Sequence, residues 1–239
     1  MTTQSQSPAV KKTPLSQFIL LCVISVVFFP ALTLLLAGDW SWVEGWIFGL
    51  WFDAMLLSNI VYMYWRDPAL LAERSKRPGA GNQKRWDTYL LSFVYLVAIF
   101  WLVIMPLDAK RFGWSPAFPV WLMVVGGILL LPALYFLLRP AIENTYLSTR
   151  VRIQSERKQQ VISTGVYGFV RHPLYLGALL MMVGAPLLLG SIVGLVISAG
   201  ALIILIVRII GEEKMLVNEL EGYEAYKTKV KYRLIPYVW

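Results

Sequence analysis

Two groups of polar residues in the last third of the chain have the types and spacing that chemistry needs. The first lies in residues 163–177, which read STGVYGFVRHPLYLG. Gly165 and Gly168 permit backbone conformations closed to other residues, and Pro173 is favoured in the first turn of a helix. A glycine-rich approach to a helix N-terminus can bind an anion such as a carboxylate. The stretch therefore predicts a ligand site at the start of a helix.

The side chains of this stretch admit two interpretations. Tyr167 and Tyr175 can stack on a flat ring or hydrogen-bond to it, and Arg171 and His172 can supply positive charge. Alternatively, Arg171 and His172 mark a membrane interface and the tyrosines belong to an aromatic belt. The residues alone leave both interpretations open.

The second group is RIIGEEKML at residues 208–216. Arg208 and Glu212 stand four residues apart and so share one helical face, where an ion pair would contribute about 0.5 kcal/mol or less. A short loop would return this helix alongside the helix that begins at Pro173. Glu212 and Glu213 would then lie at the same level along the two helices as Arg171 and His172. Carboxylates, cations and aromatic rings together suit an amino-acid-bearing nucleotide.

The composition indicates what must position these groups. The chain has 239 residues, of which 58% are hydrophobic and 15% charged, and its mean hydropathy is +0.62. Soluble domains carry about 25% charged residues, so we predict an integral membrane protein and exclude soluble enzymes and disordered chains. Cys22 and His172 are the only residues of their kinds, which excludes an intrachain disulfide and cysteine-rich or paired-histidine metal sites. No metal is expected.

Apolar runs predict an all-α polytopic helix bundle with about six membrane spans. The final apolar stretch, Pro173–Val207, holds 35 residues without a charge, which is too long for one span of about 20. Gly190–Ser191 divides it into a tight hairpin. The six predicted spans are Leu15–Ala37, Trp42–Trp65, Tyr89–Leu107, Ala117–Leu138, and the two arms of that hairpin.

The basic residues indicate the orientation of these spans. With the N-terminus inside, 20 of the 22 Lys and Arg residues are cytoplasmic, and only Lys110 and Arg111 lie outside. Such an excess is the usual signature of cytoplasmic loops. We therefore expect both termini in the cytoplasm. The cytoplasmic Lys and Arg residues account for the net charge of +8, so we predict no nucleic-acid partner. We also predict no protein partner.

Three regions follow from this division. Residues 1–14 form a polar tail, residues 15–138 a four-helix transmembrane region, and residues 139–239 the region that holds both polar groups and where we expect the function to lie. The stretch 218–230 is typical of a C-terminal helix interrupted at Gly222, and lysines near its end suit an anionic membrane surface. We expect it to be an interfacial anchor.

The ordered motifs resemble a known family, the integral-membrane S-adenosylmethionine-dependent methyltransferases. This family includes isoprenylcysteine carboxyl methyltransferase and the phospholipid methyltransferases. The resemblance lies in RHPLYLG at 171–177, GEEKML at 211–216, GYEAY at 222–226 and YRLIP at 232–236. It covers roughly the last 80 residues and is closest to bacterial proteins similar to the isoprenylcysteine enzyme. The resemblance therefore implies the inner membrane of a bacterium, a catalytic and cofactor-binding region at residues 139–239, and a substrate side formed by residues 15–138.

The resemblance implies a pocket for S-adenosyl-L-methionine that opens sideways to the bilayer. Arg208 would face the substrate, and Glu212 or Glu213 would bind the polar end of the cofactor. The acidic pair lies one residue closer to Tyr223 than in the prenylcysteine enzymes, so the choice between the two glutamates stays open. The residues implied to line the cofactor are Val161, Gly165, Tyr167, Arg171, His172, Pro173, Leu174, Tyr175, Glu212 and Glu213.

The implied reaction is methyl transfer to a lipid-like or lipidated acceptor, with Arg208 and Glu212 as catalytic residues. A carboxylate or thiolate acceptor is already nucleophilic, whereas an amine must lose a proton. Arg208 as an anion clamp favours a carboxylate, so carboxyl O-methylation of the isoprenylcysteine type leads. Phospholipid N-methylation and small-thiol S-methylation are the alternatives within the family. A non-catalytic membrane scaffold or small transporter is the alternative of another class.

Overall fold

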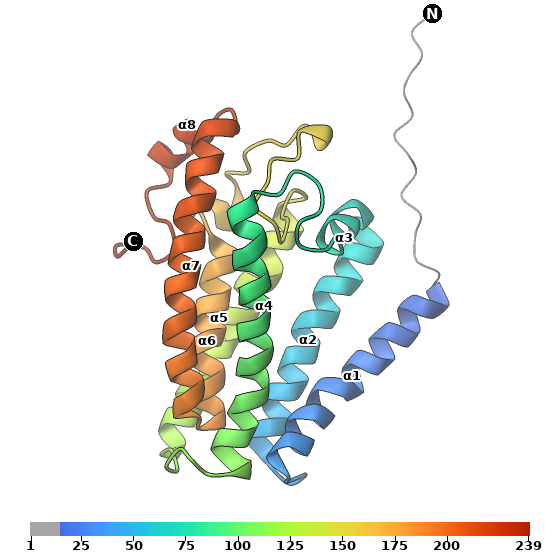
Figure 1. Ribbon diagram of the computed structural model, residues 1–239, viewed down its shortest axis with the longest axis vertical. Coiled ribbons are helices and arrows are strands. Elements are labelled where there is room, and N and C mark those ends of the chain that lie inside the picture. The colour runs from blue at the N-terminus through green and yellow to red at the C-terminus, as the bar shows by residue number, and fades with distance from the viewer. Residues whose placement is uncertain (1–14) are drawn as a thin grey trace, which may run out of the picture.

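The computed structural model describes residues 15–239, and throughout this part of the chain the regular structure is helical, without a strand (Figure 1). The predicted polar tail at residues 1–14 lies outside the described residues. The helices are α1 (Leu15–Ala37), α2 (Val43–Arg66), α3 (Pro68–Arg74), α4 (Arg85–Pro106), α5 (Val120–Glu143), α6 (Pro173–Leu189), α7 (Ile192–Glu219) and α8 (Tyr223–Lys229). The all-helical class predicted from the sequence is confirmed.

Each predicted span coincides with one long apolar helix, because uninterrupted apolar side chains favour a structure that satisfies its own backbone hydrogen bonds. In the described residues, α2, α4, α5 and α7 are long and apolar enough to cross a membrane. The helix α6 is apolar but has only 17 residues. The count of six spans therefore remains a prediction.

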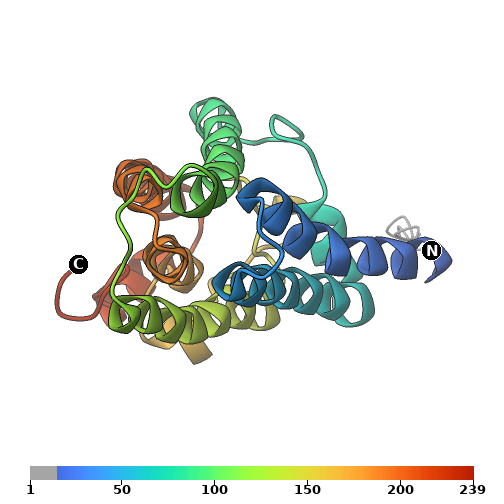
Figure 2. The same ribbon diagram turned by 90° about the horizontal axis from the view of Figure 1, so that it is seen from below.

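Helices α5 and α6 lie side by side in both views because small residues allow their backbones to meet (Figures 1 and 2). A Cβ added at Gly126 of α5 would lie 2.3 Å from the backbone nitrogen of Leu188. A Cβ added at Gly177 of α6 would lie 2.8 Å from the backbone nitrogen of Leu137. This close packing is common between membrane helices, and it holds α6 firmly in the bundle.

The hairpin between α6 and α7 forms where it was predicted. Gly190 ends α6 in the left-handed conformation, with φ of +77°, which glycine adopts without strain. The Ser191 hydroxyl accepts a hydrogen bond from the backbone nitrogen of Gly194 at 2.8 Å and so caps α7. The Ser191 hydroxyl also donates to the buried carboxylate of Asp108, at 2.6 Å. These contacts fix the start of α7 relative to the segment that follows α4.

The opposite end of the bundle carries the irregular part of the fold. The connection between α5 and α6, the helix α3 and the helix α8 all lie at this end (Figure 1). Tyr223 and Tyr226 of α8 are buried in a cluster with Leu220 and Val230. The apolar face of the expected interfacial anchor therefore packs against the connection between α5 and α6, and its role as a membrane anchor stays a prediction.

Candidate functional site

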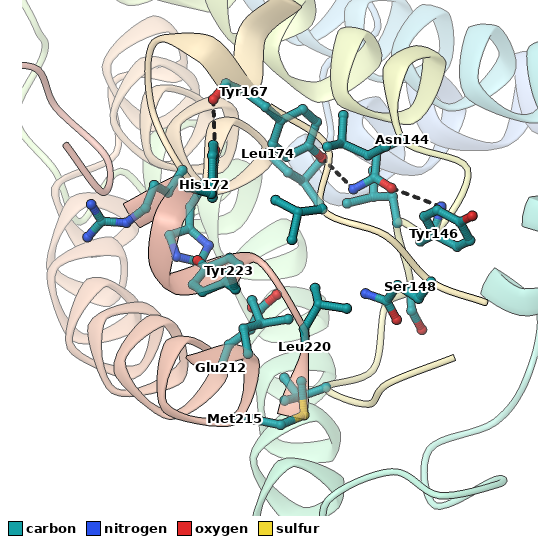
Figure 3. A pocket seen from close by; sticks show the side chains of 18 of the residues that line it. Asn144, Tyr146, Ser148, Tyr167, His172, Leu174, Glu212, Met215, Leu220 and Tyr223 are labelled. Atoms are coloured by element: carbon teal, nitrogen blue, oxygen red, sulfur yellow. Dashed lines mark hydrogen bonds between the residues drawn. The ribbon is translucent and has the colours of Figure 1, made fainter. Parts of the chain in front are cut away.

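A polar pocket of about 820 Å³, including its open mouth, lies at this irregular end. The start of α6, the end of α7, α8 and the connection after α5 surround it (Figure 3). Its lining includes Asn144, Tyr146, Ser148, Arg150, Val161, Tyr167, His172, Leu174, Tyr175, Glu212, Met215, Leu220, Tyr223 and Tyr226. Aromatic rings, amides and one carboxylate thus converge in a single cavity.

The start of α6 is held by the C-terminal segment of the chain. The backbone nitrogen of Arg171 donates to the carbonyl of Tyr232 at 3.0 Å, and that of His172 donates to the carbonyl of Arg233 at 2.9 Å. The Arg171 guanidinium also donates to the carbonyls of Val230 and Lys231, at 2.7 and 2.8 Å. The segment 230–233 therefore positions the first turn of α6.

Glu213 is the centre of a buried ionic cluster behind the pocket. Its Oε1 accepts a hydrogen bond from Nε of Arg171 at 2.6 Å and contacts Nε2 of His172 at 3.3 Å. Its Oε2 accepts from Nε of Arg233 at 2.7 Å. With 4% of its surface exposed and no place in the pocket lining, Glu213 joins α7 to the start of α6 and to the C-terminal segment.

Glu212 points the other way, into the pocket. Its carboxylate accepts a hydrogen bond from the Tyr175 hydroxyl at 2.7 Å and has no other hydrogen bond among the described residues. The remaining lone pairs can therefore accept bonds from a ligand. The neighbouring glutamates thus have separate structural positions, and Glu212 is the one that a molecule in the pocket would touch.

Two tyrosines in the lining of the pocket offer hydroxyl groups. The Tyr167 hydroxyl accepts a hydrogen bond from Nδ2 of Asn144 at 3.2 Å. The Tyr223 hydroxyl is buried and has no hydrogen-bond partner among the described residues. Burial raises the pKa of both tyrosines well above the ordinary value, so both hydroxyls stay protonated at neutral pH. A buried hydroxyl without a partner is costly, so the Tyr223 hydroxyl is available for a hydrogen bond to a molecule in the pocket.

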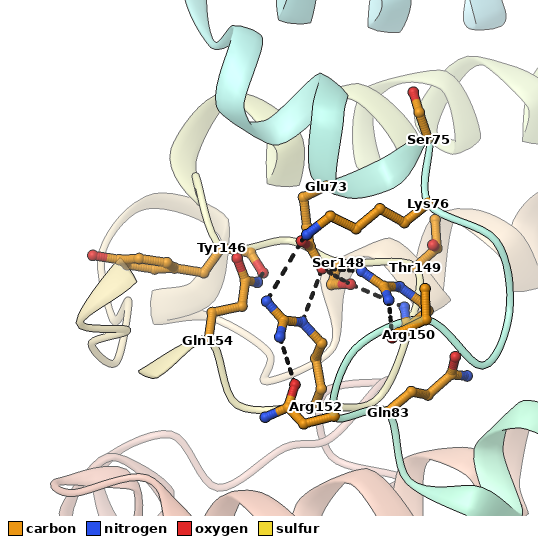
Figure 4. A network of polar contacts seen from close by, with 12 residues as sticks. Glu73, Ser75, Lys76, Gln83, Tyr146, Ser148, Thr149, Arg150, Arg152 and Gln154 are labelled. Carbon is orange, nitrogen blue, oxygen red and sulfur yellow. Dashed lines mark hydrogen bonds and ion pairs between the residues drawn. The ribbon is translucent and has the colours of Figure 1, made fainter. Parts of the chain in front are cut away.

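The wall formed by the connection after α5 depends on a second buried cluster, around Glu73 of α3 (Figure 4). The Glu73 carboxylate contacts Nη2 of Arg150 at 2.5 Å, Nε of Arg152 at 3.0 Å and Nζ of Lys76 at 2.9 Å. Burial alone would raise the pKa of the Glu73 carboxyl, but the bond from Lys76 and the two guanidinium charges lower it to about 2. The carboxylate therefore stays ionised and holds two pocket-lining arginines in place.

Arg208 lies one turn before Glu212 on α7, but its partner is Asp87 of α4. Its Nε donates to Oδ1 of Asp87 at 2.9 Å, and its Nη2 donates to the carbonyl of Thr149. The carbon of its guanidinium stands 5.9 Å from the centre of the Tyr175 ring. No ion pair joins Arg208 to Glu212 among the described residues, so the sequence-based alternative of such a pair is wrong. The fold brings Asp87 into contact with Arg208 although the two residues are 121 positions apart in the chain, so sequence spacing could not indicate this pair.

An apolar cavity of about 740 Å³, including its open mouth, begins at Arg208 and extends between α4, α6 and α7. Its lining consists of Val94, Val97, Ala98, Trp101, Ala178, Met181, Met182, Ile197, Ala201, Ile204, Leu205 and Arg208. Tyr175 and Glu212 line the polar pocket, whereas Ala178 and Arg208, one turn away on the same helices, line the apolar cavity. The two cavities therefore lie end to end along α6 and α7.

The structure brings most of the predicted site residues together. Val161, Tyr167, Arg171, His172, Pro173, Leu174, Tyr175 and Glu212 all line the polar pocket. Three others lie elsewhere. Arg208 belongs to the apolar cavity and Glu213 to the ionic cluster. Gly165 packs against α5, where an added Cβ would lie 2.1 Å from the carboxylate of Glu143.

Several pocket residues were not predicted. Asn144, Tyr146 and Arg150 come from a connection without an evident motif. Asp87, at the start of α4, was not predicted either and contacts the site through Arg208. Tyr223 and Tyr226 lie in the motif GYEAY, which was available as a signal but was interpreted as part of an anchor. Their three-residue spacing on one helical face could have indicated that both face the same cavity.

The pocket and its helices can be compared with known proteins. Residues 121–218 match the Isoprenylcysteine carboxyl methyltransferase (ICMT) family. The resemblance predicted from the motifs is confirmed. The ICMT match covers α5, α6 and nearly all of α7, including the motifs at 171–177 and 211–216, and it ends before α8. Together with the apolar helices, the ICMT match supports a membrane methyltransferase. No curated protein matches the chain.

Proposed function

We propose that this protein transfers a methyl group from S-adenosyl-L-methionine to the carboxylate of a lipid-like or lipidated acceptor, of the isoprenylcysteine type. The observation that carries the proposal is the pair of cavities that lie end to end. One is polar and aromatic, and the other is apolar and begins at an arginine. A polar cofactor and an apolar acceptor can thus approach each other near Tyr175 without either entering the other's cavity.

The polar pocket fits the cofactor by the chemistry of its lining. An adenosine ring can lie among the aromatic side chains, and the unpartnered Tyr223 hydroxyl can bond to a polar group. Glu212 can accept hydrogen bonds from a ribose hydroxyl or an ammonium group. When bound, the cofactor would supply a methyl group activated on a sulfonium. No glycine-rich dinucleotide-binding fingerprint is needed for this arrangement.

The acceptor side depends on Arg208. Two of its nitrogens are bonded to Asp87 and Thr149, but Nη1 has no hydrogen bond among the described residues. Nη1 can therefore donate to an oxyanion at the head of the apolar cavity. A buried charge of this kind needs partners at membrane depth. We assign Arg208 to the binding and orientation of the acceptor carboxylate.

The residues at the site act by positioning. Arg208 holds the acceptor carboxylate, which needs no general base because it is already nucleophilic. Tyr175 lies between the two cavities, where its ring faces Arg208 and its hydroxyl holds Glu212. Orientation of two reactants and exclusion of water are strong contributions to catalysis. Two features favour a carboxylate over an amine acceptor. The free Nη1 of Arg208 can bond to a carboxylate, and a carboxylate, unlike a protonated amine, needs no base to become nucleophilic.

The proposal predicts that replacing Glu212 by glutamine weakens cofactor binding by about 1–3 kcal/mol, or roughly 5- to 150-fold. The charge that accepts hydrogen bonds from the cofactor is lost, while the fold keeps nearly all its contacts. Calorimetric titration of S-adenosyl-L-methionine into detergent-purified protein measures the effect.

Methyl transfer to an S-prenylcysteine, assayed in parallel with a phospholipid amine and a small thiol, identifies the acceptor. Folded wild-type protein that fails to bind millimolar cofactor would overturn the enzymatic proposal and favour a scaffold or transporter. Normal cofactor affinity in the Glu212→Gln variant would exclude Glu212 from the cofactor site.

We also propose that the end of the bundle with the polar pocket faces the cytoplasm, since nearly all basic residues lie there. In a Cys22→Ser background, a cysteine at the exposed Ala117 is expected to react with a membrane-impermeant thiol reagent in intact cells. A cysteine at the exposed Ser155, near the pocket, should react only after permeabilisation. Labelling in the reverse order would overturn this orientation.

A further inference from the structure

We infer that Asp87 is a positioning residue for methyl transfer: it holds the guanidinium of Arg208 in the orientation that presents Nη1 to the acceptor, and it weakens acceptor binding in doing so. The inference rests on the proposed function. Asp87 lies on α4, outside the segment that matches the family. It is the acidic partner of an arginine that heads the apolar cavity.

The geometry separates the two oxygens of this carboxylate. Oδ1 accepts one hydrogen bond, from Nε of Arg208 at 2.9 Å. Oδ2 accepts two, from Nε2 of Gln83 at 2.7 Å and from the backbone nitrogen of Val151 at 2.8 Å. Asp87 is fully buried. One oxygen therefore fixes the arginine, while the other fixes the wall of the polar pocket to which Val151 belongs.

Asp87 and the carbonyl of Thr149 together fix one side of the guanidinium. With Nε and Nη2 bonded in this way, Nη1 is the nitrogen left for a ligand. Because the guanidinium is planar, two fixed nitrogens determine the direction of the third. The carboxylate thus contributes an orientation that Arg208 alone, at the end of a flexible side chain, would lack.

The same carboxylate opposes the binding of an anionic acceptor. Two like charges at either side of one guanidinium repel each other, and at roughly 10 Å with an effective dielectric constant near 20 the effect on binding is about tenfold. Asp87 is therefore expected to weaken acceptor affinity while it supports turnover. A residue that only stabilised the fold would reduce both quantities when removed.

The variant Asp87→Asn isolates the bond to Arg208. The carbonyl oxygen of the introduced asparagine can accept the two hydrogen bonds that Gln83 and Val151 now donate to Oδ2. The amide nitrogen then faces Arg208 and cannot accept a hydrogen bond from it. The wall of the polar pocket is thereby preserved. We expect turnover to fall at least tenfold, the Kd of an S-farnesylcysteine carboxylate to decrease by about tenfold, and the Kd of the cofactor to stay within threefold.

Probe binding is measured separately from methyl transfer, through the fluorescence of the tryptophans, of which Trp101 lines the apolar cavity. The carboxamide of the same probe should bind wild type and variant equally. Asp108→Asn is the matched control, because Asp108 is also fully buried but bonds to Ser191 at the hairpin between α6 and α7. It should change neither probe affinity nor the preference for the carboxylate.

A double variant keeps the test decisive if Asp87→Asn is poorly stable. Arg208→Gln removes the guanidinium that Asp87 orients, so in that background Asp87→Asn should have no further effect on the residual turnover. Weaker carboxylate binding by Asp87→Asn, or an equal effect on turnover with and without Arg208, would overturn the positioning role. Wild-type protein that binds the probe but transfers no methyl group would refute the proposed function and leave the binding test of Asp87 intact.

Discussion

Replacing Glu213 by glutamine is expected to destabilise the protein by about 3–5 kcal/mol, because two buried guanidinium groups lose their counter-charge. For a chain of this length, this corresponds to a decrease in melting temperature of about 10 °C. Glu213 joins α7 to Arg171 and Arg233, so its loss also releases the segment 230–233 from the start of α6. Thermal unfolding in detergent, followed by the fluorescence of the tryptophans, measures the change.

The neighbouring variant Glu212→Gln is the matched control for this experiment. It changes the same chemical group one residue away, but only the Tyr175 hydroxyl contacts that group in the described structure. Its melting temperature without cofactor should lie within about 2 °C of wild type. If the two variants melted alike, the ionic cluster around Glu213 would have no special role in stability.

Replacing Arg208 by lysine is expected to decrease turnover at least 100-fold while cofactor affinity stays within about threefold, or under ~0.7 kcal/mol. Lysine keeps the positive charge but cannot bond to Asp87, to the Thr149 carbonyl and to an acceptor in one plane. Of the two cavities, Arg208 lines only the apolar one, so the cofactor should be little affected. Calorimetry and a methyl-transfer assay on the same preparation measure both quantities.

The outcome distinguishes two positions for Arg208 in the mechanism. A parallel loss of cofactor affinity and turnover would place it in the cofactor site, contrary to our assignment. Normal turnover in the lysine variant would mean that charge alone is sufficient and that the planar geometry of the guanidinium is irrelevant. Lys84→Arg, at a partly exposed ion pair with Glu219 on the same side of the molecule, controls for exchange of these residue types and should alter neither quantity.

Local features of the sequence were sufficient to predict the long apolar helices. Apolar runs predicted α1, α2, α4, α5 and α6 to within about five residues at each end, because a membrane helix depends on the composition of its own segment. The helix α7 continues beyond its predicted end at Val207 to Glu219, and the short helix α3 was not predicted. The hairpin at Gly190–Ser191 was also predictable, since a left-handed turn favours glycine and a helix start favours serine. The motif RHPLYLG likewise predicted a ligand pocket at the start of α6.

The division of roles among the charged residues was decided only by the tertiary structure. Glu212 and Glu213 are adjacent and chemically alike, yet they point to opposite sides of α7, one into the pocket and one into the ionic cluster. Arg208 pairs with Asp87, which is 121 residues away in the chain. The sequence alone established the types of charged groups in the site. Their partners depend on which helix faces meet, because electrostatic interactions are set by distance and burial and not by separation along the chain.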